Sequence, residues 1–544
     1  MKRYNVCIVY EAYSYLTKGM EEPKYTVASD SETTGEEKSS PAFAEIAIGI
    51  DIGTSQCSIA VWNGSEVELL KNTRNQKLMR SYVTFKEEVP SGGVSNQISH
   101  EYEILSGVAI FNMKRLIALV NNAWRSTTPE EVLAIFLVEL RAMAELQLKK
   151  PIRNVVLTIP VSFSRFQLTR IERACAMAGL HILRLMPEPT AVALLYAQQQ
   201  QQTVHENMGS GSEKNALIFN MGAGYCDVAV TATAGGVSQI KALAGAAIGG
   251  EDILQNMMQY LLPNSESLFL NHRVNEIKSL GLLRVATEDA IHQLSSQSSV
   301  QVNVDLGNGS KIYKVVTREE FEQVNLKVFE KCESLVRQCL RDSKVDIEDL
   351  TDVILVGGCS YIPKIRNVVK AVCKREELYK AIDPLEAAVC GAALEGAVAS
   401  GIIDPFGNLD LLTIQATPLG IGIRADGNCF VPIIPRNTTM PARKELLFTT
   451  THDNQTEALI LVYEGTDQPM APFMEVRMPT VDDGHGWCAE ALNRSYGSTL
   501  DLVTVQKKIA ILYSNRCQNH DLRMASNHAQ YEDLSVRSTS HEEE

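Results

Sequence analysis

The same local pattern occurs twice in this chain: an apolar strand ends in a polar residue, a turn containing glycine follows, and a second apolar strand leads away. The first copy covers residues 47–62 and the second covers residues 216–230. The strand ends and turn glycines of the two copies are Asp51, Gly53, Asn220, Gly222 and Gly224. One such hairpin alone would favour an ordinary exposed turn, because short glycine turns are common. Two of them, far apart in the sequence, favour a duplicated unit instead.

The residue types of these turns suit a phosphate group. A glycine lets the backbone come close to a bound molecule, and the N–H groups and hydroxyls of such a turn can donate to phosphate oxygens. A carboxylate at the strand end can hold a hydrated Mg²⁺ ion. A third apolar strand ends in Gly357 and Gly358, where the bare backbone can pack against a purine ring. The pattern therefore predicts a nucleotide held between two related halves.

Together these segments resemble the nucleotide-binding domain of the 70-kilodalton heat-shock chaperone family (DnaK-type), within the actin and sugar-kinase superfamily. The resemblance runs over residues 45–465, and its most specific motifs are residues 113–117, 188–191, 249–252 and 356–358. It implies an α/β fold: an actin-like (ribonuclease-H-like, duplicated) nucleotide-binding domain followed by an all-β sandwich module. Strand and helix patterns alternate up to about residue 405 and only strand patterns follow, which agrees with that architecture.

The chain divides into five predicted segments. They are a disordered lead-in over residues 1–44, an actin-like ATP-binding domain over 45–405, an interdomain linker over 406–414, a peptide-binding-like β-sandwich over 415–510 and a polar, acidic tail over 511–544. No counterpart of the helical lid of the family is expected after the sandwich. The chain therefore looks like a divergent and C-terminally truncated member.

Composition limits the classes of partner and the location. The formal net charge of −14 disfavours a nucleic-acid binder, which would present a basic face, but it does not exclude one ATP in a local turn. Twelve cysteines without a C-x-x-C pair indicate reduced thiols of a cytosolic protein rather than a disulfide framework. The most apolar stretch, residues 387–403, contains Glu395 and several glycines, and is predicted to be a core helix rather than a membrane span. We therefore expect a cytoplasmic protein that binds neither nucleic acid nor membrane.

The resemblance also implies a role for each matching residue. Asp51, Glu188 and Asp227 would surround a Mg²⁺ ion through waters. Lys114 would reach the γ-phosphate of ATP and orient the attacking water. The other residues expected to contact ATP or ADP are Gly53, Thr54, Ser55, Gln56, Gly222, Gly224, Gly249, Gly250, Glu251, Glu288, Ser295, Gly357 and Gly358. The apolar positions expected to line a peptide groove are Ile423, Phe448, Ala458 and Ile460.

Three substitutions depart from the family pattern where they matter for hydrolysis and coupling. Asn220 stands where the family has an aspartate, and Tyr225 replaces a threonine that approaches the γ-phosphate. Leu168 replaces an arginine that helps pass the nucleotide state to the β module. One lost group that positions metal or water can cost on the order of a hundredfold in rate, so we expect at most a slow ATPase that converts ATP to ADP and phosphate. The positions expected to act in catalysis are Lys114, Glu188, Asp227 and Asn220.

Two functions from different classes remain open at this point. The leading hypothesis is an ATP-binding molecular chaperone of the heat-shock 70 kDa type, which assists folding and refolding by binding exposed peptide segments and hydrolyses ATP weakly. The alternative is a nucleotide-sensing scaffold or co-chaperone without productive turnover. A small-molecule kinase of the same superfamily is disfavoured, because it has no use for a β module. The expected partners are unfolded or extended polypeptides, J-domain co-chaperones and nucleotide exchange factors.

Overall fold

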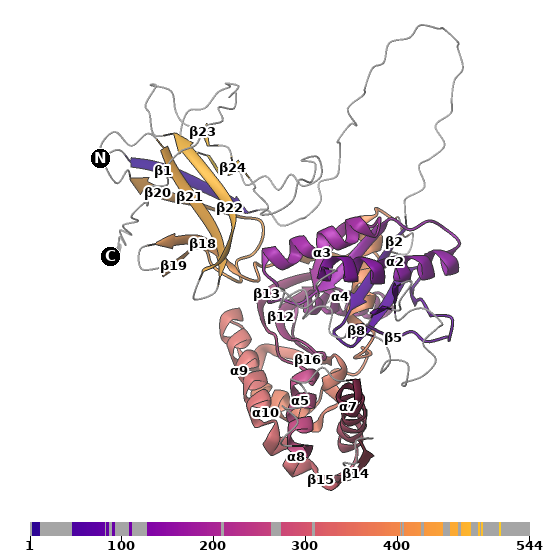
Figure 1. The fold of residues 1–544 in the computed structure, drawn as a ribbon. Coiled ribbons are helices and arrows are strands. Elements are labelled where there is room, and N and C mark those ends of the chain that lie inside the picture. The colour runs from indigo at the N-terminus through magenta and orange to yellow at the C-terminus, as the bar shows by residue number, and fades with distance from the viewer. Residues whose placement is uncertain are drawn as a thin grey trace, which may run out of the picture.

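The structure of this chain is a computed structural model. It describes residues 3–10, 46–81, 83–85, 90–92, 108–110, 128–207, 212–262, 274–306, 311–402, 404, 407–425, 429–449, 457–465, 469–479, 488–489, 491–492 and 511–512. A large α/β domain occupies most of this length, and a smaller module of strands, coloured orange to yellow, lies beside it (Figure 1). The division into an α/β domain and a β module is the one that the sequence predicted.

The first half of the α/β domain is built on a sheet with the strand order β10-β9-β2-β3-β4, with β5 added next to β3. Its strands are β2 (Ala47–Ile52), β3 (Gln56–Trp62), β4 (Val67–Leu69), β5 (Met79–Arg80), β9 (Asn154–Ile159) and β10 (His181–Pro187). β2, β9 and β10 run parallel, whereas β2, β3 and β4 form an antiparallel meander. Two helices, α2 (Pro129–Leu148) and α3 (Arg165–Met177), share an apolar core with this sheet. A small separate sheet contains β6 (Val83–Phe85), β7 (Pro90–Gly92) and β8 (Val108–Ile110).

The second half repeats this arrangement with the strand order β16-β11-β12-β13-β17. Its strands are β11 (Lys214–Met221), β12 (Cys226–Ala234), β13 (Val237–Ala246), β16 (Leu350–Val356) and β17 (Leu412–Ile414). Again three strands form an antiparallel meander and β16 joins β11 in parallel. The helices of this half are α5 (Gly250–Leu261), α7 (Val274–Leu294), α8 (Arg318–Val324), α9 (Leu326–Ser343) and α10 (Pro363–Cys373). The same half also contains the hairpin of β14 (Ser299–Asp305) and β15 (Lys311–Thr317) and the short 3-10 helices η1 (Ile347–Asp349) and η2 (Gly358–Tyr361). The duplication predicted from the two glycine hairpins is therefore present in the fold.

Two buried helices, α4 (Glu188–Asn207) and α11 (Ala387–Ala399), join the halves. Side chains of α4 pack against strands of both sheets. The backbones approach so closely that a Cβ on Gly391 would lie 1.9 Å from the carbonyl oxygen of Ala191, and one on Gly49 would lie 2.3 Å from the nitrogen of Ala393. The apolar stretch that contains α11 is thus a core helix, as predicted, and no helix in the described part of the chain is long and apolar enough to cross a membrane.

The β module consists of two antiparallel sheets. One has the order β19-β18-β21-β22-β24, and the other has the order β20-β1-β25-β23. Their strands are β18 (Gly420–Ala425), β19 (Cys429–Ile434), β20 (Ala442–Thr449), β21 (Glu457–Gly465), β22 (Pro469–Pro479), β23 (Cys488–Ala489), β24 (Ala491–Leu492), β25 (Ile511–Leu512) and, from the opposite end of the chain, β1 (Arg3–Tyr10). In Figure 1 the indigo strand β1 lies among the orange and yellow strands of this module.

Strand β1 requires a correction to the predicted lead-in over residues 1–44. The sequence assigned this whole segment to disorder, yet residues 3–10 form a strand. The reason is that the partner of β1 is β20, near the other end of the chain, and no local composition reveals such a partner. Residues 11–44 of the predicted lead-in, and nearly all of the predicted tail over 511–544, lie outside the described residues.

The predicted linker is partly a strand as well. β17 pairs in parallel with β13, with Leu412 opposite Val237 and Ile414 opposite Gln239. Leu411, just before the strand, is buried, whereas Leu412 is 56% exposed. The linker therefore lies along the edge of the second-half sheet and connects it directly to the β module.

Candidate functional site

The two glycine hairpins meet each other at the centre of the α/β domain. The first turns between β2 and β3, where Ile52 lies opposite Cys57, and the second turns between β11 and β12. A Cβ on Gly224 would lie 2.1 Å from the hydroxyl oxygen of Thr54, so the threonine side chain of one turn rests on the bare backbone of the other. The neighbouring Ser55 is exposed to solvent. The residues predicted to hold phosphate are thus brought together from two distant segments.

Of the carboxylates predicted for the metal site, Asp51 and Asp227 lie near strand ends in the two different sheets, and Glu188 is the first residue of α4. Asp51, at the end of β2, accepts a hydrogen bond from the hydroxyl of Thr158 at the end of β9. Asp227 is fully buried, and its carboxylate accepts a hydrogen bond from the backbone N–H of Val161 at 3.1 Å. The segment from Thr158 to Val161 therefore orients an acidic group from each half. Thr158 was missed in the sequence, although a polar residue inside an otherwise apolar strand was the available signal.

Asn220 takes an active part in this arrangement. Its amide nitrogen donates to a carboxylate oxygen of Glu188, at the start of α4, over 2.7 Å. Both residues were predicted as site residues, and Asn220 is only 5% exposed. An aspartate at this position would offer a second negative charge, whereas the asparagine offers a proton donor. The substitution therefore converts a pair of carboxylates into a hydrogen-bonded amide–carboxylate pair.

The glycines before α5 support the second hairpin. The backbone N–H of Gly250 donates to the carbonyl of Gly222 at 3.0 Å, and the N–H of Glu251 donates to the carbonyl of Ala223 at 2.8 Å. A Cβ on Gly249 would lie 2.4 Å from that same Ala223 carbonyl oxygen. The N-terminus of α5 is thus packed directly on the turn, which places its positive dipole end close to the predicted phosphate position.

Glu251 is engaged elsewhere through its side chain. Both of its carboxylate oxygens pair with the guanidinium of Arg284 on α7, at 2.5 and 2.9 Å. The carboxylate is almost fully buried. This ion pair joins α5 to α7, the helix that also carries the predicted pocket residue Glu288 and ends just before Ser295. The contribution of Glu251 to the turn is therefore its backbone N–H, while its side chain holds the two helices together.

The third glycine element lies beside the second hairpin. Gly357 has a φ of 82°, and a Cβ there would lie 2.3 Å from the carbonyl oxygen of Met221 and 2.9 Å from the side-chain oxygen of Asn220. Its neighbour Gly358 is nearly free of such contacts. The thiol of Cys359 donates to the carbonyl of Gly222 at 3.3 Å, and burial raises its pKa to about 12, so it stays protonated. These contacts fix the end of β16 against the second hairpin turn.

Tyr225 bridges the two halves of the domain. It follows the second hairpin turn, yet its ring packs in the core of the first half and meets the ring of Phe163 edge-on, with centroids 5.4 Å apart. Leu168, which replaces the expected arginine, packs against that same core from α3. A threonine and an arginine at these positions would be polar, so both departures replace polar groups with apolar contacts inside the first half.

Two predicted features of the site are Lys114 and the metal ligands. Lys114 lies outside the described residues. Among the residues that the structure describes, no group of three acidic, histidine or cysteine side chains is arranged to ligate a metal ion directly. Mg²⁺ usually keeps several waters and uses one or two carboxylates, so the prediction that Asp51, Glu188 and Asp227 surround the ion through waters does not require such a group.

The predicted peptide positions divide between the two sheets of the β module. Ile423 on β18 lies opposite Val462 on β21, and both side chains are buried. Ile460 and Ala458 occupy the alternate positions before Val462 along the same strand, so all four positions share one face of the sheet. Phe448 belongs to β20 in the other sheet. Three of the four predicted positions are therefore brought together, and the fourth is not.

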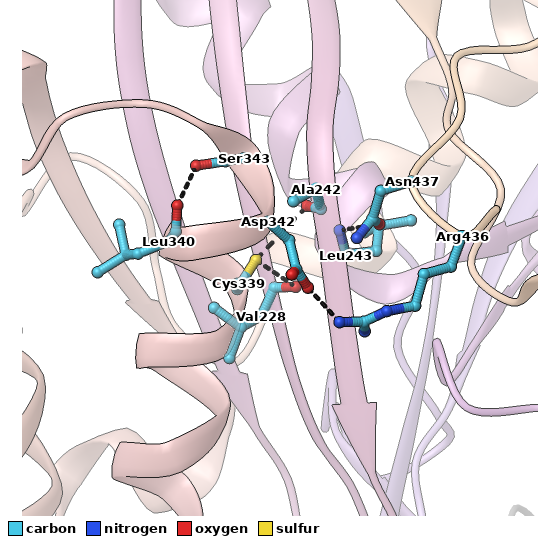
Figure 2. A network of polar contacts seen from close by, with 9 residues as sticks. All are labelled: Val228, Ala242, Leu243, Cys339, Leu340, Asp342, Ser343, Arg436 and Asn437. Carbon is cyan, nitrogen blue, oxygen red and sulfur yellow. Dashed lines mark hydrogen bonds and ion pairs between the residues drawn. The ribbon is translucent and has the colours of Figure 1, made fainter. Parts of the chain in front are cut away.

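Figure 2 shows how the β module contacts the second half of the α/β domain. Arg436 forms an ion pair with Asp342 near the end of α9, and each side chain is about a quarter exposed. Next to it, the side-chain oxygen of Asn437 accepts a hydrogen bond from the backbone N–H of Leu243 on β13 at 2.8 Å. Asn437 has a φ of 62°, a conformation that asparagine tolerates better than most residues. Two adjacent residues of the module therefore hold a helix and a strand of the domain at once.

On the domain side of this junction, hydrogen bonds tie the helix to the sheet. The thiol of Cys339 on α9 donates to the carbonyls of Val228 and Ala242, at 3.5 and 3.6 Å, which ties the helix to β12 and β13 (Figure 2). A third contact lies at the start of α3, where a carboxylate oxygen of Glu464 accepts the backbone N–H of Arg165 at 2.6 Å. The module is thus docked on both halves of the domain.

Comparison with known proteins agrees with this geometry. The Hsp70 protein family model matches residues 47–122 and 118–475. Heat shock 70 kDa protein 8 of Arabidopsis thaliana is 62% identical over 90% of this chain and 100% of its own length. A heat shock protein of Pyricularia oryzae and a ribosome-associated molecular chaperone of Saccharomyces cerevisiae are 31% and 30% identical, over 77% of this chain and 72% of theirs. With the duplicated α/β domain and its docked β module, these matches show that the chain belongs to the Hsp70 family and is an Hsp70-type chaperone.

Proposed function

We propose that this Hsp70 protein binds Mg–ATP between the two glycine hairpins, hydrolyses it slowly, and uses its β module to hold extended polypeptide segments. ATP binding and peptide binding are properties of the family. The slow hydrolysis is inferred from the residues of this chain. The observation that carries it is the hydrogen bond between Asn220 and Glu188, where an amide replaces a carboxylate in the middle of the acidic group.

The residues present fit a hydrated Mg²⁺ ion with reduced charge around it. When bound, the ion would neutralise phosphate charge and orient the phosphates. Asp51 and Asp227 are held in place by Thr158 and the N–H of Val161, so their orientation is set before a ligand arrives. The carboxylate of Glu188 accepts a hydrogen bond from the Asn220 amide. The acidic group is thus pre-organised, but it has one negative charge fewer than a set with aspartate at position 220.

The peptide-binding part of the proposal rests on the first sheet of the β module. Ile423 and Ile460 lie on one apolar face of this sheet; both are buried in the structure, so the expectation that they contact an extended peptide comes from the family. J-domain co-chaperones and nucleotide exchange factors are the partners we expect for the α/β domain. A cytosolic location is also proposed, because eight cysteines of the α/β domain are free thiols and seven of them are buried.

The proposal is tested by comparing ATP binding with a single turnover. Equilibrium titration is expected to show saturable Mg–ATP binding, and a single-turnover experiment with labelled ATP is expected to show slow release of phosphate that still exceeds the protein-free rate. Asp227→Asn provides the control, since it alters a fully buried carboxylate of the site and should abolish the residual hydrolysis. Phosphate release at the protein-free rate, with ATP still bound, would support a nucleotide-sensing scaffold instead.

The two glycines of the second hairpin turn give a prediction that separates binding from folding. A Cβ on Gly222 meets nothing within 4 Å, whereas one on Gly224 would clash with Thr54. We expect Gly222→Ala to change the free energy of unfolding by less than about 0.5 kcal/mol and to weaken ATP binding about tenfold, because the added methyl occupies space beside the phosphates. We expect Gly224→Ala to destabilise the protein by about 1–3 kcal/mol.

Denaturant titration and ATP titration of both variants provide the measurement. The matched pair matters because each change adds one methyl group to the same turn. If Gly222→Ala bound ATP as tightly as the unmodified protein, the second hairpin would not face the phosphates.

A further inference from the structure

The N-terminal strand β1 belongs to the β module and not to the α/β domain that follows it in the sequence. All eight of its residues pair antiparallel with β20, from Arg3 opposite Thr449 to Tyr10 opposite Ala442. On its other edge β1 pairs with β25, which in turn pairs with β23. β1 is therefore an inner strand of its four-stranded sheet, with neighbours on both sides (Figure 1).

The second sheet of the β module depends on this one strand. Among the strands that the structure describes, β20 has β1 as its strand partner, and β25 reaches β20 only through β1. Without β1, the N–H and C=O groups along one edge of β20 would lose their ladder. Such an unpaired edge readily takes up another extended chain. The gap between β20 and β25 is thus a slot with the width of one strand.

The sequence of β1 suits this slot. Apolar residues occupy position 4 and every position from Val6 to Tyr10, so the positions Tyr4, Val6, Ile8 and Tyr10 give one face of the strand an apolar row. Directly opposed residues of an antiparallel pair share one face of the sheet. Two of these apolar positions lie opposite apolar residues of β20, since Tyr4 faces Phe448 and Val6 faces Leu446. A shift of the register by one residue in either direction would lose one of these two apolar pairs, so the observed register keeps both.

The same chain can supply the strand. Residues 11–46 connect β1 to β2 in the α/β domain. At about 3.3–3.6 Å per residue, a segment of this length can span on the order of 100 Å when extended. Because this connection is covalent, β1 meets the slot as an intramolecular partner, at an effective concentration that does not depend on the protein concentration. An extended peptide from outside would have to compete against that concentration.

From these observations we propose that the slot between β20 and β25 is a binding site for one extended polypeptide strand, and that residues 3–10 of the same chain are its built-in occupant. This site is distinct from the apolar face that contains Ile423 and Ile460, which belongs to the other sheet. The ligand class is an extended segment of about eight residues with apolar side chains at alternate positions. Binding uses the main-chain ladder of β20 for affinity and the alternate positions for selectivity.

A disulfide experiment on the full-length chain tests the pairing. Cys7 lies opposite Glu445 on one face, while Lys444 lies opposite Ile8 on the other face. Opposed Cβ atoms in such pairs are about 4.5–5.5 Å apart, close to the spacing that a disulfide needs. We expect Glu445→Cys to form a bond with the natural Cys7 in most molecules under mild oxidation, and the matched variant Lys444→Cys to form none.

Peptide mapping of the monomer by mass spectrometry identifies the bond, and Cys7→Ser added to Glu445→Cys should remove it. Equal cross-linking in both variants, or none in either, would overturn the proposed pairing. A bond found only between two chains would show that the occupant comes from a second copy, which contradicts the intramolecular assignment.

A competition experiment tests the slot itself. The probe is a fluorescent peptide with the sequence of residues 2–11, added to the full-length chain. Val6→Pro places a residue with a fixed φ and no N–H in the middle of β1 and should release the strand, so we expect the probe to bind this variant at least tenfold more tightly than the unmodified chain. Leu16→Pro, outside the ladder, is the control and should leave binding unchanged.

The Glu445→Cys variant makes the test independent of the proline. Its oxidised form should exclude the probe, and reduction of the same sample should restore the weak binding of the unmodified chain. Equal binding of the probe to the oxidised and reduced forms would show that the probe does not enter the slot, and the proposal would fail.

Discussion

The variant Asn220→Asp is expected to hydrolyse ATP in a single turnover about tenfold to a hundredfold faster than the unmodified protein, and only when Mg²⁺ is present. Removing one group that stabilises charge in a catalytic site typically costs a factor of this size or more, so restoring it should recover a comparable factor. In the structure the Asn220 amide donates to Glu188, and an aspartate would place a second carboxylate there. A hydrated divalent ion can interact with the carboxylates of both Glu188 and the introduced aspartate, whereas with asparagine at this position only the Glu188 carboxylate carries a charge.

Two controls decide between a gained charge and a lost hydrogen bond. Asn220→Ala removes the donor without adding charge, so it should leave Glu188 without this partner and give no rate increase. Two adjacent carboxylates repel each other when no cation is bound. The Asn220→Asp variant should therefore melt at a lower temperature than the unmodified protein in chelator, and Mg–ADP should reduce the difference. An unchanged single-turnover rate in Asn220→Asp would show that Asn220 is not the reason for slow hydrolysis.

The second large effect is expected at the junction between the β module and the α/β domain. Reversing the charge of Arg436 with Arg436→Glu should shift the equilibrium from the docked to the undocked arrangement by about tenfold to a hundredfold. Hydrogen bonds to charged groups contribute about 1.5–3 kcal/mol, and the variant adds repulsion from Asp342. Because each side chain is about a quarter exposed, the expected effect lies below that of a fully buried pair.

Limited proteolysis of the linker provides the measurement. Leu411 is buried and β17 is paired with β13 while the module is docked, so cleavage within residues 407–414 should accelerate in Arg436→Glu. The matched control is Arg337→Glu on the same helix, α9, since Arg337 pairs with Glu333 of that helix and not with the module. The double exchange Arg436→Asp with Asp342→Arg should restore protection. If Arg436→Glu were cleaved no faster than Arg337→Glu, the ion pair would not hold the module.

The site depends on contacts that the family pattern alone did not indicate. The sequence identified Glu251 as a residue of the nucleotide site, and the structure shows its carboxylate in a buried ion pair with Arg284. The sequence identified Asn220 as a missing charge, and the structure adds that its amide binds Glu188. The roles of these residues toward ATP stay predictions, since they rest on variants still to be measured.

Most elements of the α/β domain, and the family, could be predicted from residue order alone. The strand–turn–strand repeats, the capping box that starts α8 at Thr317 and the apolar run of α11 all follow from local residue order, because hydrogen-bond donors, glycine conformations and apolar spacing act within a few residues. The two halves and the β module were therefore predictable, and the family matches confirm the assignment.

Which distant segments share a site became visible in the folded chain. The contact of Thr54 with Gly224, the docking of Arg436 on Asp342 and the pairing of β1 with β20 each join residues far apart in the chain. A local pattern specifies that a segment can form a strand or a turn, but many partners satisfy the same pattern. The choice among them is made by the packing of the whole chain, where register, burial and charge must agree at once.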